Sequence, residues 1–302
     1  MVNFYMLIGP AGCGKSTYAK SLCNDNTILI SSDATRKELF GDENFQGDNN
    51  KVFLTMIQRA RNALLDGQNV VWDATSMSRK RRIGILQSMP KGTVFHAIVV
   101  IATLDEIKKQ NAQRDRTVDE EVIMKQIQSF QAPYFTEGFD TIQVIGNSHY
   151  TRSELVDNMV NCQHENPHHR DGSVWDHCRA MRAAHLYDII SGKYEWNENE
   201  KIIYDACTFH DCGKPFVKFY DEDHIAHYHG HDGFSAYAYM SLLVNTLYIP
   251  EEPHDKLKTA VVIGEHMHMH RPDFKLSKLE QRIGSELVEL CERLRYYDAT
   301  NA

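Results

Sequence analysis

The sequence lacks the features that would place the protein in a membrane or outside the cell. No apolar run approaches the roughly 20 residues that a membrane-spanning helix needs. The first residues, MVNFYMLIGP, have neither the basic start nor the small-residue cleavage site of a signal peptide. The seven cysteines are odd in number, scattered and without a CxxC pair. We therefore expect a cytoplasmic protein with no membrane partner and no disulfide framework.

The sequence also lacks a strong positive charge, with 33 Lys and Arg against 41 Asp and Glu. Residues 1–150 have 17 basic and 16 acidic side chains, whereas residues 151–302 have 16 basic and 25 acidic ones. This balance argues against a broad surface for duplex DNA, although a local basic groove could hold a nucleic-acid end. Fourteen of the 16 histidines lie from His164 onward, so we expect the two halves to carry different chemistry.

The first half contains a phosphate-binding loop between a strand and a helix. Residues 4–8 are an apolar run typical of a buried parallel strand, GPAGCGKS follows at 9–16, and TYAKSLC then indicates a helix. This is the pattern GxxxxGK[ST] in its required setting. Its glycines let backbone N–H groups curl around the β-phosphate, Lys15 can reach the β- and γ-oxygens, and Ser16 can hold Mg²⁺. The residues expected to bind ATP and Mg²⁺ are Gly9, Gly12, Gly14, Lys15, Ser16 and Thr17.

Three further strands are predicted at 27–31, 70–75 and 95–102. Strands that alternate with helical stretches indicate a parallel sheet, whose ligands bind at the carboxyl ends of the strands. Asp33 and Arg36 follow the second strand, and Asp73 ends the third. Asp33 could accept a proton from an attacking hydroxyl or could cap the next helix. Asp73 could act on bound Mg²⁺ without binding it directly, or could be a strand-end cap.

Two arginine-containing segments follow. The run 79–82 is RKRR, which we expect to be a solvated helix face. Arg114 and Arg116 lie among polar residues before the predicted helix 119–130, as in a mobile lid. Arginines in such a lid could clamp the transferring phosphoryl group. The alternative is that they form surface salt bridges.

Several of these motifs occur together over residues 1–148: the phosphate loop, Asp33-xx-Arg36, the DAT that begins at Asp73, Asn-xx-Arg-x-Arg-x-Val at 111–118, and the segment 133–140. The combination resembles the 5′-hydroxyl polynucleotide kinases, which are the kinase modules of bacterial and phage RNA repair enzymes. The resemblance implies that Asp33 is the general base toward the 5′-OH and that Arg36 contacts the adjacent nucleotide phosphate. It implies that Arg114 and Arg116 close over the ATP phosphates. The family often has Arg where this chain has Gln110.

The second half is predicted to be a separate, all-α domain. The length is about twice that of a one-domain protein, and 42% hydrophobic residues suffice for two cores. We place the first domain at 1–150, a linker at 151–163 and the second domain at 164–302. Within the second domain, helical patterns occur at 175–192, 199–214, 234–248 and 278–302.

The second half also offers ligands for a divalent transition metal, because it combines imidazoles and carboxylates. His210 and Asp211 are adjacent and about 100° apart on a helix, so they could bind one metal or bridge two. The alternative is that histidines merely solvate an acidic domain, which we expect of His224, His227, His254 and His270. The metal candidates are His177, His210, Asp211, His231, His266 and Asp298.

The segment FHDCGKP at 209–215 resembles the central motif of the HD phosphohydrolase superfamily, particularly the HD domains attached to tRNA nucleotidyltransferases. The resemblance covers about residues 162–302. It implies a second metal site completed by His231 and His266, with His268 as an alternative to His266. The core ligands it implies are His177, His210, Asp211 and Asp298. Candidates for binding a substrate phosphate are His169, Arg170 and Lys214, the last of which could instead cap a helix end.

The sequence thus predicts an α/β P-loop kinase domain, with a parallel sheet and flanking helices, followed by an all-α HD domain. Together they indicate a nucleic-acid end-healing enzyme that phosphorylates 5′-OH ends with ATP and Mg²⁺. The HD domain would remove a 2′,3′-cyclic, 2′- or 3′-phosphate with one or two divalent metals, for which Mn²⁺, Ni²⁺, Co²⁺, Zn²⁺ and Fe²⁺ all fit. RNA ends are the favoured partner, in cooperation with a ligase. The alternatives are a small-molecule or nucleoside kinase joined to an HD nucleotidase, and a non-catalytic nucleotide sensor.

Overall fold

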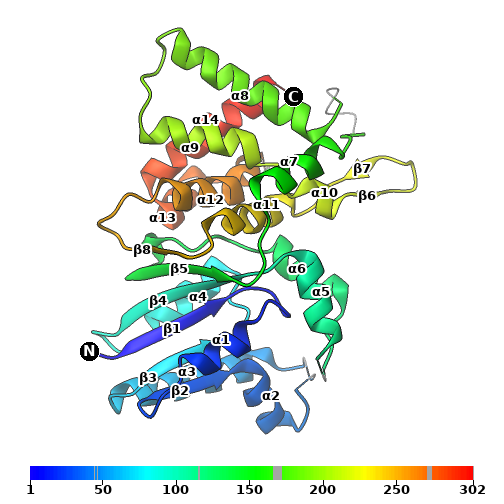
Figure 1. The fold of residues 1–302 in the computed structure, drawn as a ribbon. Helices are drawn as coiled ribbons and strands as arrows, with labels where there is room; N and C mark the ends of the chain where they lie inside the picture. Colours follow the sequence, from blue (N-terminus) through cyan, green and yellow to red (C-terminus); the bar gives the residue numbers. More distant parts are fainter. Residues whose placement is uncertain (44, 46, 115, 166–171, 271–273, 302) are drawn as a thin grey trace.

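The computed structural model describes residues 1–43, 45, 47–114, 116–165, 172–270 and 274–301. One six-stranded sheet, with five strands from the first half of the chain and one from the second, is covered by helices on both faces (Figure 1). Its strand order is β2-β3-β1-β4-β5-β8, and every neighbouring pair is parallel except β5 and β8. No helix within these described ranges is both long and apolar enough to span a bilayer.

The four strands predicted for the first half are confirmed, to within two residues at each end. They are β1 (Asn3–Ile8), β2 (Thr27–Ser31), β3 (Asn69–Asp73) and β4 (Val94–Ile101). A fifth parallel strand, β5 (Thr141–Gly146), was not predicted. Strands buried on both faces form nearly continuous apolar runs, and β1 follows this rule, since Met6, Leu7 and Ile8 are fully buried.

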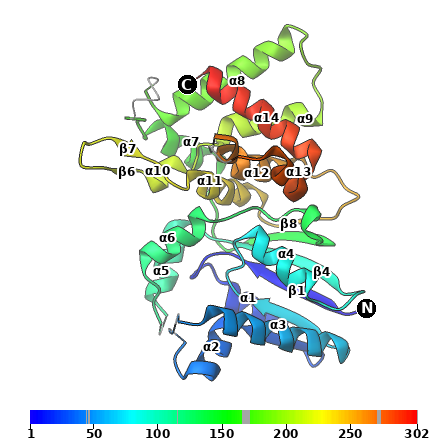
Figure 2. The same ribbon diagram turned by 180° about the vertical axis from the view of Figure 1, so that it is seen from behind.

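Helices follow each of these strands and place their loops at one edge of the sheet. Figures 1 and 2 show α1 on one face and α3 and α4 on the other. The carboxyl ends of β1, β2 and β3 therefore bring the phosphate loop, Asp33 and Asp73 to the same edge. The helices of the first half are α1 (Lys15–Ser21), α2 (Ser32–Phe40), α3 (Asn49–Leu65), α4 (Arg79–Gln87), α5 (Leu104–Ala112) and α6 (Glu120–Gln128).

The second half is mostly helical, but two of the predicted helices are divided. The stretch 199–214 separates into α9 and α10, and 278–302 separates into α13 and α14 at Gly284, whose φ of 89° lies in the left-handed region. The helices are α7 (Arg152–Val160), α8 (Val174–Ile190), α9 (Glu198–Phe209), α10 (Lys214–Val217), α11 (His231–Met240), α12 (Asp255–Glu265), α13 (Leu276–Ile283) and α14 (Ser285–Thr300).

The predicted helix over 234–248 is wrong in its last part, and this half is not purely helical. After α11 and one short 3₁₀ turn, β8 (Thr246–Tyr248) joins the edge of the first-half sheet antiparallel to β5. A three-residue strand has no periodicity of its own, so the pairing with β5 decides its conformation. The strands β6 (Phe219–Tyr220) and β7 (Ala226–His227) form a separate, antiparallel hairpin in this half.

The segment predicted as a linker contains a helix, α7. Thr151 caps it reciprocally with Glu154, and Leu155 and Met159 are buried. The sequence shows little periodicity here, because one cap and two apolar side chains suffice for a nine-residue helix that packs against α8. The division into domains at 1–150 and 164–302 stays a prediction.

Buried polar contacts connect the two halves. The Tyr237 hydroxyl on α11 bonds both the backbone nitrogen and the backbone oxygen of Ala102, at 3.0 Å each. The expected solvated face at 79–82 is wrong for two of its four residues. Arg79 pairs with Glu137 and Glu265, and Arg82 pairs with Glu137 at 2.7 Å. Both arginines are buried because this carboxylate pair, far away in sequence, neutralises them.

Candidate functional site

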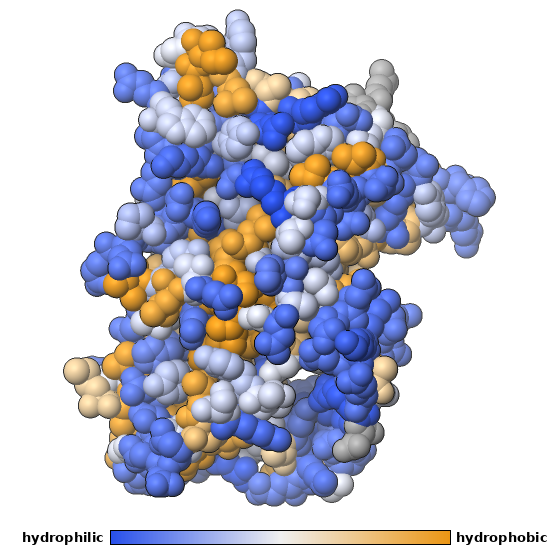
Figure 3. Space-filling model, viewed as in Figure 1, coloured by the Kyte–Doolittle hydropathy of each residue, from blue (hydrophilic) through white to orange (hydrophobic). Residues whose placement is uncertain are grey.

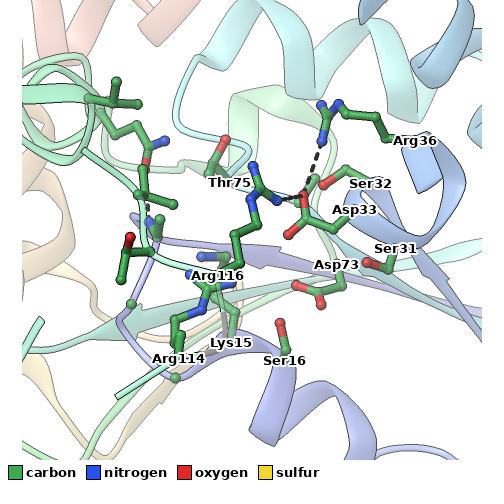
Figure 4. A pocket seen from close by; sticks show the side chains of 18 of the residues that line it. Lys15, Ser16, Ser31, Ser32, Asp33, Arg36, Asp73, Thr75, Arg114 and Arg116 are labelled. Atoms are coloured by element: carbon green, nitrogen blue, oxygen red, sulfur yellow. Dashed lines mark hydrogen bonds and ion pairs between the residues drawn. The ribbon is translucent and has the colours of Figure 1, made fainter. Parts of the chain in front are cut away.

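The first candidate site is a cavity of about 720 Å³ at the carboxyl edge of the sheet. Figure 3 shows a hollow in the lower part of the molecule with mainly hydrophilic residues around it, and Figure 4 shows the side chains that line the cavity. Every kinase residue predicted from the sequence lines it except Gly9: Gly12, Gly14, Lys15, Ser16, Thr17, Asp33, Arg36, Asp73, Arg114 and Arg116.

The phosphate loop has the backbone conformation that its glycines allow. Gly12 and Gly14 have φ of 82° and 96°, and a Cβ on Gly12 would lie 2.9 Å from the Ile107 carbonyl oxygen. Gly9 donates its N–H to the Thr75 carbonyl at 3.0 Å, which anchors the loop to the residues after β3. The Lys15 ammonium is buried and donates to the Pro10 carbonyl at 2.6 Å. Gly9 therefore supports the loop from outside the cavity.

Asp33 faces two arginines across the cavity. Its Oδ1 lies 3.0 Å from Arg36 on the same helix and 3.1 Å from Arg116 of the lid segment (Figure 4). The cap of α2 is Ser31, whose hydroxyl accepts from the Ala34 N–H, so Asp33 is not needed for capping. Asp73 is buried and lies between Asp33 and Ser16 in Figure 4. Both readings of Asp73, as a magnesium partner and as a strand-end residue, agree with this position.

The lid segment between α5 and α6 is fastened by amide side chains. The Asn111 side chain donates to the Val118 carbonyl at 2.8 Å and accepts from the Val118 N–H at 2.9 Å. Gln126 on α6 accepts the Ala11 N–H of the phosphate loop at 2.8 Å. Sequence reasoning gave Asn111 no role and missed Gln126, since no local signal links residues 115 positions apart. Arg116 forms an ion pair with Asp33, and both residues line the cavity.

The second candidate site is a buried cluster in which all six predicted metal ligands meet. Asp211 lies at its centre, with Oδ2 3.4 Å from His210 Nε2 and Oδ1 3.2 Å from His231 Nε2. His266 Nε2 lies 3.2 Å from His231 Nε2. His177 Nε2 lies 3.1 Å from the Asp298 carboxylate, which completes the cluster.

Backbone carbonyls orient three of these imidazoles. The Nδ1 atom of His177 lies 3.2 Å from the carbonyl oxygen of Asn301. The Nδ1 atom of His231 lies 2.8 Å from the carbonyl oxygen of Tyr228, and that of His266 lies 2.6 Å from the carbonyl oxygen of Ile263. A carbonyl only accepts, so each Nδ1 donates a proton outward, and Nε2 is the ring atom turned toward the cluster. Metal-bound histidines are usually held by such outer hydrogen bonds.

The donor set fits a divalent metal. Two groups of three ligand atoms, each within 4.8 Å of one another, share Asp211: His177, His210 and Asp211, and Asp211, His231 and His266. Burial and the neighbouring histidines lower the pKa of His266 to about 3, so its imidazole is neutral. The pKa of the Asp211 carboxyl lies well below its usual value, because His210 and Lys214 outweigh the effect of burial. A shared carboxylate with two imidazoles on each side suits two cations.

The structure separates His266 from His268. His266 is part of the cluster, whereas His268 Nδ1 lies 3.0 Å from Glu265. His270 was expected only to solvate the domain, but its Nε2 lies 3.5 Å from the Asp298 carboxylate. His254 was also expected to be a solvating residue, and it bonds the Tyr134 hydroxyl at 2.8 Å. The sequence could not separate His266, His268 and His270, because HMHMH repeats one local pattern.

One of the three phosphate-binding candidates lies beside the cluster. The Lys214 ammonium is buried, 2.7 Å from Asp211 Oδ2 and 3.4 Å from His164 Nε2. Its side chain is therefore directed to the cluster and does not cap a helix end. His169 and Arg170 lie outside the described residues.

Comparison with known proteins gives a family match within the first half of the chain. Residues 4–133 match the AAA domain family, and no curated protein matches the chain. A chain of the Pnkp1/Rnl/Hen1 RNA repair complex is 21% identical with a TM-score of 0.39, over 42% of this chain and 43% of that chain. A gluconokinase from Sinorhizobium meliloti is 18% identical with a TM-score of 0.32, over 43% and 76%. A tunicamycin resistance protein from Deinococcus radiodurans is 15% identical with a TM-score of 0.33, over 46% and 88%.

The chain spans less than half of the length of the RNA repair chains that it matches. The family match, the parallel sheet and the phosphate loop agree over the same residues. The first half of the chain thus contains a P-loop α/β domain with a parallel sheet, and its residues 4–133 are similar to the AAA domain family.

Proposed function

We propose that the kinase domain transfers the γ-phosphate of ATP to the 5′-OH of a polynucleotide. The observation that carries the proposal is that one cavity combines a phosphate loop with Asp33, Arg36 and Arg116. Lys15 and Ser16 would bind the ATP phosphates, and Asp33 would face the acceptor hydroxyl. The Asp33-xx-Arg36 spacing and the lid motif are those that resemble the 5′-hydroxyl polynucleotide kinases.

The transfer needs one base and several cations. The 5′-oxygen forms a bond to the γ-phosphorus, the bond from that phosphorus to the ADP oxygen breaks, and Asp33 takes the hydroxyl proton. Arg116 would leave Asp33 and, with Arg114, bind the oxygens of the phosphoryl group. Bound Mg²⁺, next to Ser16 and Asp73, would neutralise phosphate charge.

The acceptor side of the cavity fits a phosphodiester. Asp33 at 3.0 Å and Asn49 at 3.0 Å hold the two terminal nitrogens of Arg36. A guanidinium that is oriented in this way can present its remaining donors to the phosphate that follows the terminal nucleoside. A polynucleotide supplies that phosphate, and a free nucleoside or sugar does not.

We also propose that the buried cluster is the metal centre of an HD-type phosphohydrolase, which removes a 2′,3′-cyclic, 2′- or 3′-phosphate. The FHDCGKP motif and the shared carboxylate of Asp211 support this proposal. His177, His210, Asp211, His231, His266 and Asp298 would hold one or two divalent metals. A bound metal of this kind activates water and neutralises phosphate charge. Lys214, together with His169 and Arg170, would bind a phosphate oxygen.

The two activities are complementary. A cleaved RNA with a 5′-OH and a cyclic phosphate needs both ends converted before a ligase can join them. The phage enzyme that resembles the kinase domain pairs its kinase with a phosphatase carrying DxDGT, a motif that this sequence lacks. The HD-type centre would take that phosphatase's place, with RNA ends as substrate and a ligase as the next enzyme.

A single RNA tests both proposals. We would incubate an oligonucleotide bearing a 5′-OH and a 2′,3′-cyclic phosphate with labelled ATP, Mg²⁺ and Mn²⁺, and follow both ends. We expect label at the 5′ end, abolished by Lys15→Ala, and opening of the 3′ end, abolished by Asp211→Ala. Labelling without opening would leave the kinase and reject end healing. If nucleosides or sugars were phosphorylated and RNA were not, the small-molecule kinase would replace the proposal. Binding of ATP with no reaction on any acceptor would favour the sensor.

A further inference from the structure

One wall of the kinase cavity is formed by an arginine stacked on an aromatic ring. The Arg81 guanidinium carbon lies 4.7 Å from the centroid of the Phe53 ring. Phe53 in turn stacks on the buried Trp72, with ring centroids 6.3 Å apart and planes at 30°. Both Phe53 and Arg81 line the cavity. The Phe53 ring thus contacts both the buried Trp72 and the Arg81 guanidinium.

Arg81 differs from the other residues of the 79–82 run. Arg79 and Arg82 are buried in ion pairs with carboxylates, whereas Lys80 and Arg81 are exposed. Of the two exposed cations, Arg81 lines the cavity and Lys80 does not. Arg81 thus has a position that its neighbour lacks, although both have the same charge on the same helix.

The charge of Arg81 remains available to a ligand. Asp33 engages Arg36 and Arg116 in the cavity, but no carboxylate within the described residues forms an ion pair with Arg81. Stacking uses the face of a guanidinium and leaves the N–H groups at its edge. Such an edge matches two oxygens of a phosphate.

The wall also connects Arg81 with the acceptor side of the cavity. Arg36 donates to Asn49 at 3.0 Å, and Phe53 follows Asn49 by four residues, on the same side of α3. Arg36 contacts Asn49, Arg81 contacts Phe53, and all four residues line the same cavity. A chain whose first phosphate lies at Arg36 would pass Arg81 next.

We propose that Arg81, held on Phe53, binds the second internucleotide phosphate of the acceptor, one nucleotide beyond the phosphate at Arg36. This inference rests on the proposed polynucleotide kinase activity and extends its acceptor site to two phosphates. The kinase then selects a strand of at least two nucleotides over a single nucleotide with one phosphate. The contact reads no base, because it involves only the backbone.

The test compares two acceptors that differ by one nucleotide and therefore by one phosphate. Both are ribonucleotides with a 5′-OH and a 3′ methyl phosphodiester, which leaves no terminal phosphate for the second half to remove. One has a single nucleoside and one has two. For the unaltered protein we expect kcat/KM to be about tenfold higher for the longer acceptor, the usual value of one charged hydrogen-bonded contact. Arg81→Ala should abolish this gain and reduce the salt dependence of acceptor binding by about one phosphate.

Two further variants test whether the gain depends on Arg81 and its contact with Phe53. Lys80→Ala removes the same charge one residue away and should keep the gain. Phe53→Leu keeps an apolar side chain against Trp72 but removes the aromatic face, and should reduce the gain. If neither acceptor is phosphorylated by the unaltered protein, the proposed kinase function itself fails. If both are phosphorylated and Arg81→Ala keeps the full gain, the kinase function stands and the second phosphate site is rejected.

Discussion

Asp33 is the residue on which the proposed kinase chemistry depends most. Replacement by Asn keeps the size of the side chain and an oxygen for Arg36 and Arg116 but removes the proton acceptor. We expect Asp33→Asn to lower kcat on a 5′-OH oligonucleotide by about 10²–10⁴, with little change in the KM for ATP. Asp25→Asn, an exposed aspartate near the start of β2, is the matched control. An Asp33→Asn variant with kcat within threefold of the control would show that another group takes the proton.

His266 and His268 form a matched pair for the metal centre, because they are two residues apart and only His266 joins the cluster. We expect the His266→Ala variant to bind about one metal ion per chain where the unaltered protein binds two. The ligand group that contains His266 would keep only Asp211 and His231. His268→Ala should keep both. Metal content after equilibration with Mn²⁺ and removal of the excess measures the difference. Equal loss in the two variants would contradict the proposed ligand set.

The sequence could place single residues in the fold where a motif fixes their spacing from a strand. Lys15, Asp33 and Arg36 follow predicted strands at short spacings, and all three line one cavity. The sequence could not separate His266 from His268, because their positions depend on the path of the 3₁₀ turn over His266–His270. Nor could it find Gln126, whose partner Ala11 is brought near only by the folded sheet.

Helix α6 connects the two candidate sites. Gln126 holds the phosphate loop, and two residues later the Gln128 side chain donates to the His229 carbonyl at 3.0 Å, next to the metal candidate His231. A Cβ on Gly233 of α11 would lie 2.1 Å from the Gln128 carbonyl oxygen. The close approach of α6 and α11 therefore requires glycine at 233.

Gly233→Ala tests this packing. We expect it to destabilise the protein by about 1–3 kcal/mol, because the added methyl must push the two elements apart. Gly84→Ala is the control, since nothing lies within 4 Å of its Cβ and it is inside α4. Alanine there should raise stability by up to about 1 kcal/mol. Urea unfolding measures the free energy of unfolding of each variant. Similar free energies for Gly233→Ala and Gly84→Ala would contradict the tight contact between Gly233 and Gln128.

One element that the sequence missed, β8, needs a distant partner. The strands β1 to β4 carry their own apolar runs and were predicted, whereas β8 is a three-residue strand that exists through its pairing with β5. The predicted helix over 234–248 continued past Met240 because Leu242, Leu243 and Val244 are as apolar as the helix before them. Local pattern cannot separate these cases, since the deciding hydrogen bonds join residues about 100 positions apart.

At the scale of the whole molecule, the two halves share one sheet and one buried charge network. β8 pairs with β5, and Arg79 of α4 pairs with Glu265 at the end of α12, directly before His266. Coulombic attraction to Glu265 and Glu137 outweighs the effect of burial and raises the pKa of Arg79, which therefore stays charged. Removing one partner of such a buried pair leaves the other without compensation.

We accordingly expect Arg79→Ala to lower the free energy of unfolding by about 3–5 kcal/mol and to do so in both halves at once. Lys125→Ala, which removes an exposed partner of Glu121, should change it by less than about 0.5 kcal/mol. Scanning calorimetry of the full chain should show one transition, shifted to lower temperature by Arg79→Ala, with equal calorimetric and van't Hoff enthalpies. Two separate transitions, of which Arg79→Ala moves one, would mean that the halves unfold independently. In that case the pairing of β8 with β5 would not couple the proposed kinase domain to the proposed metal centre.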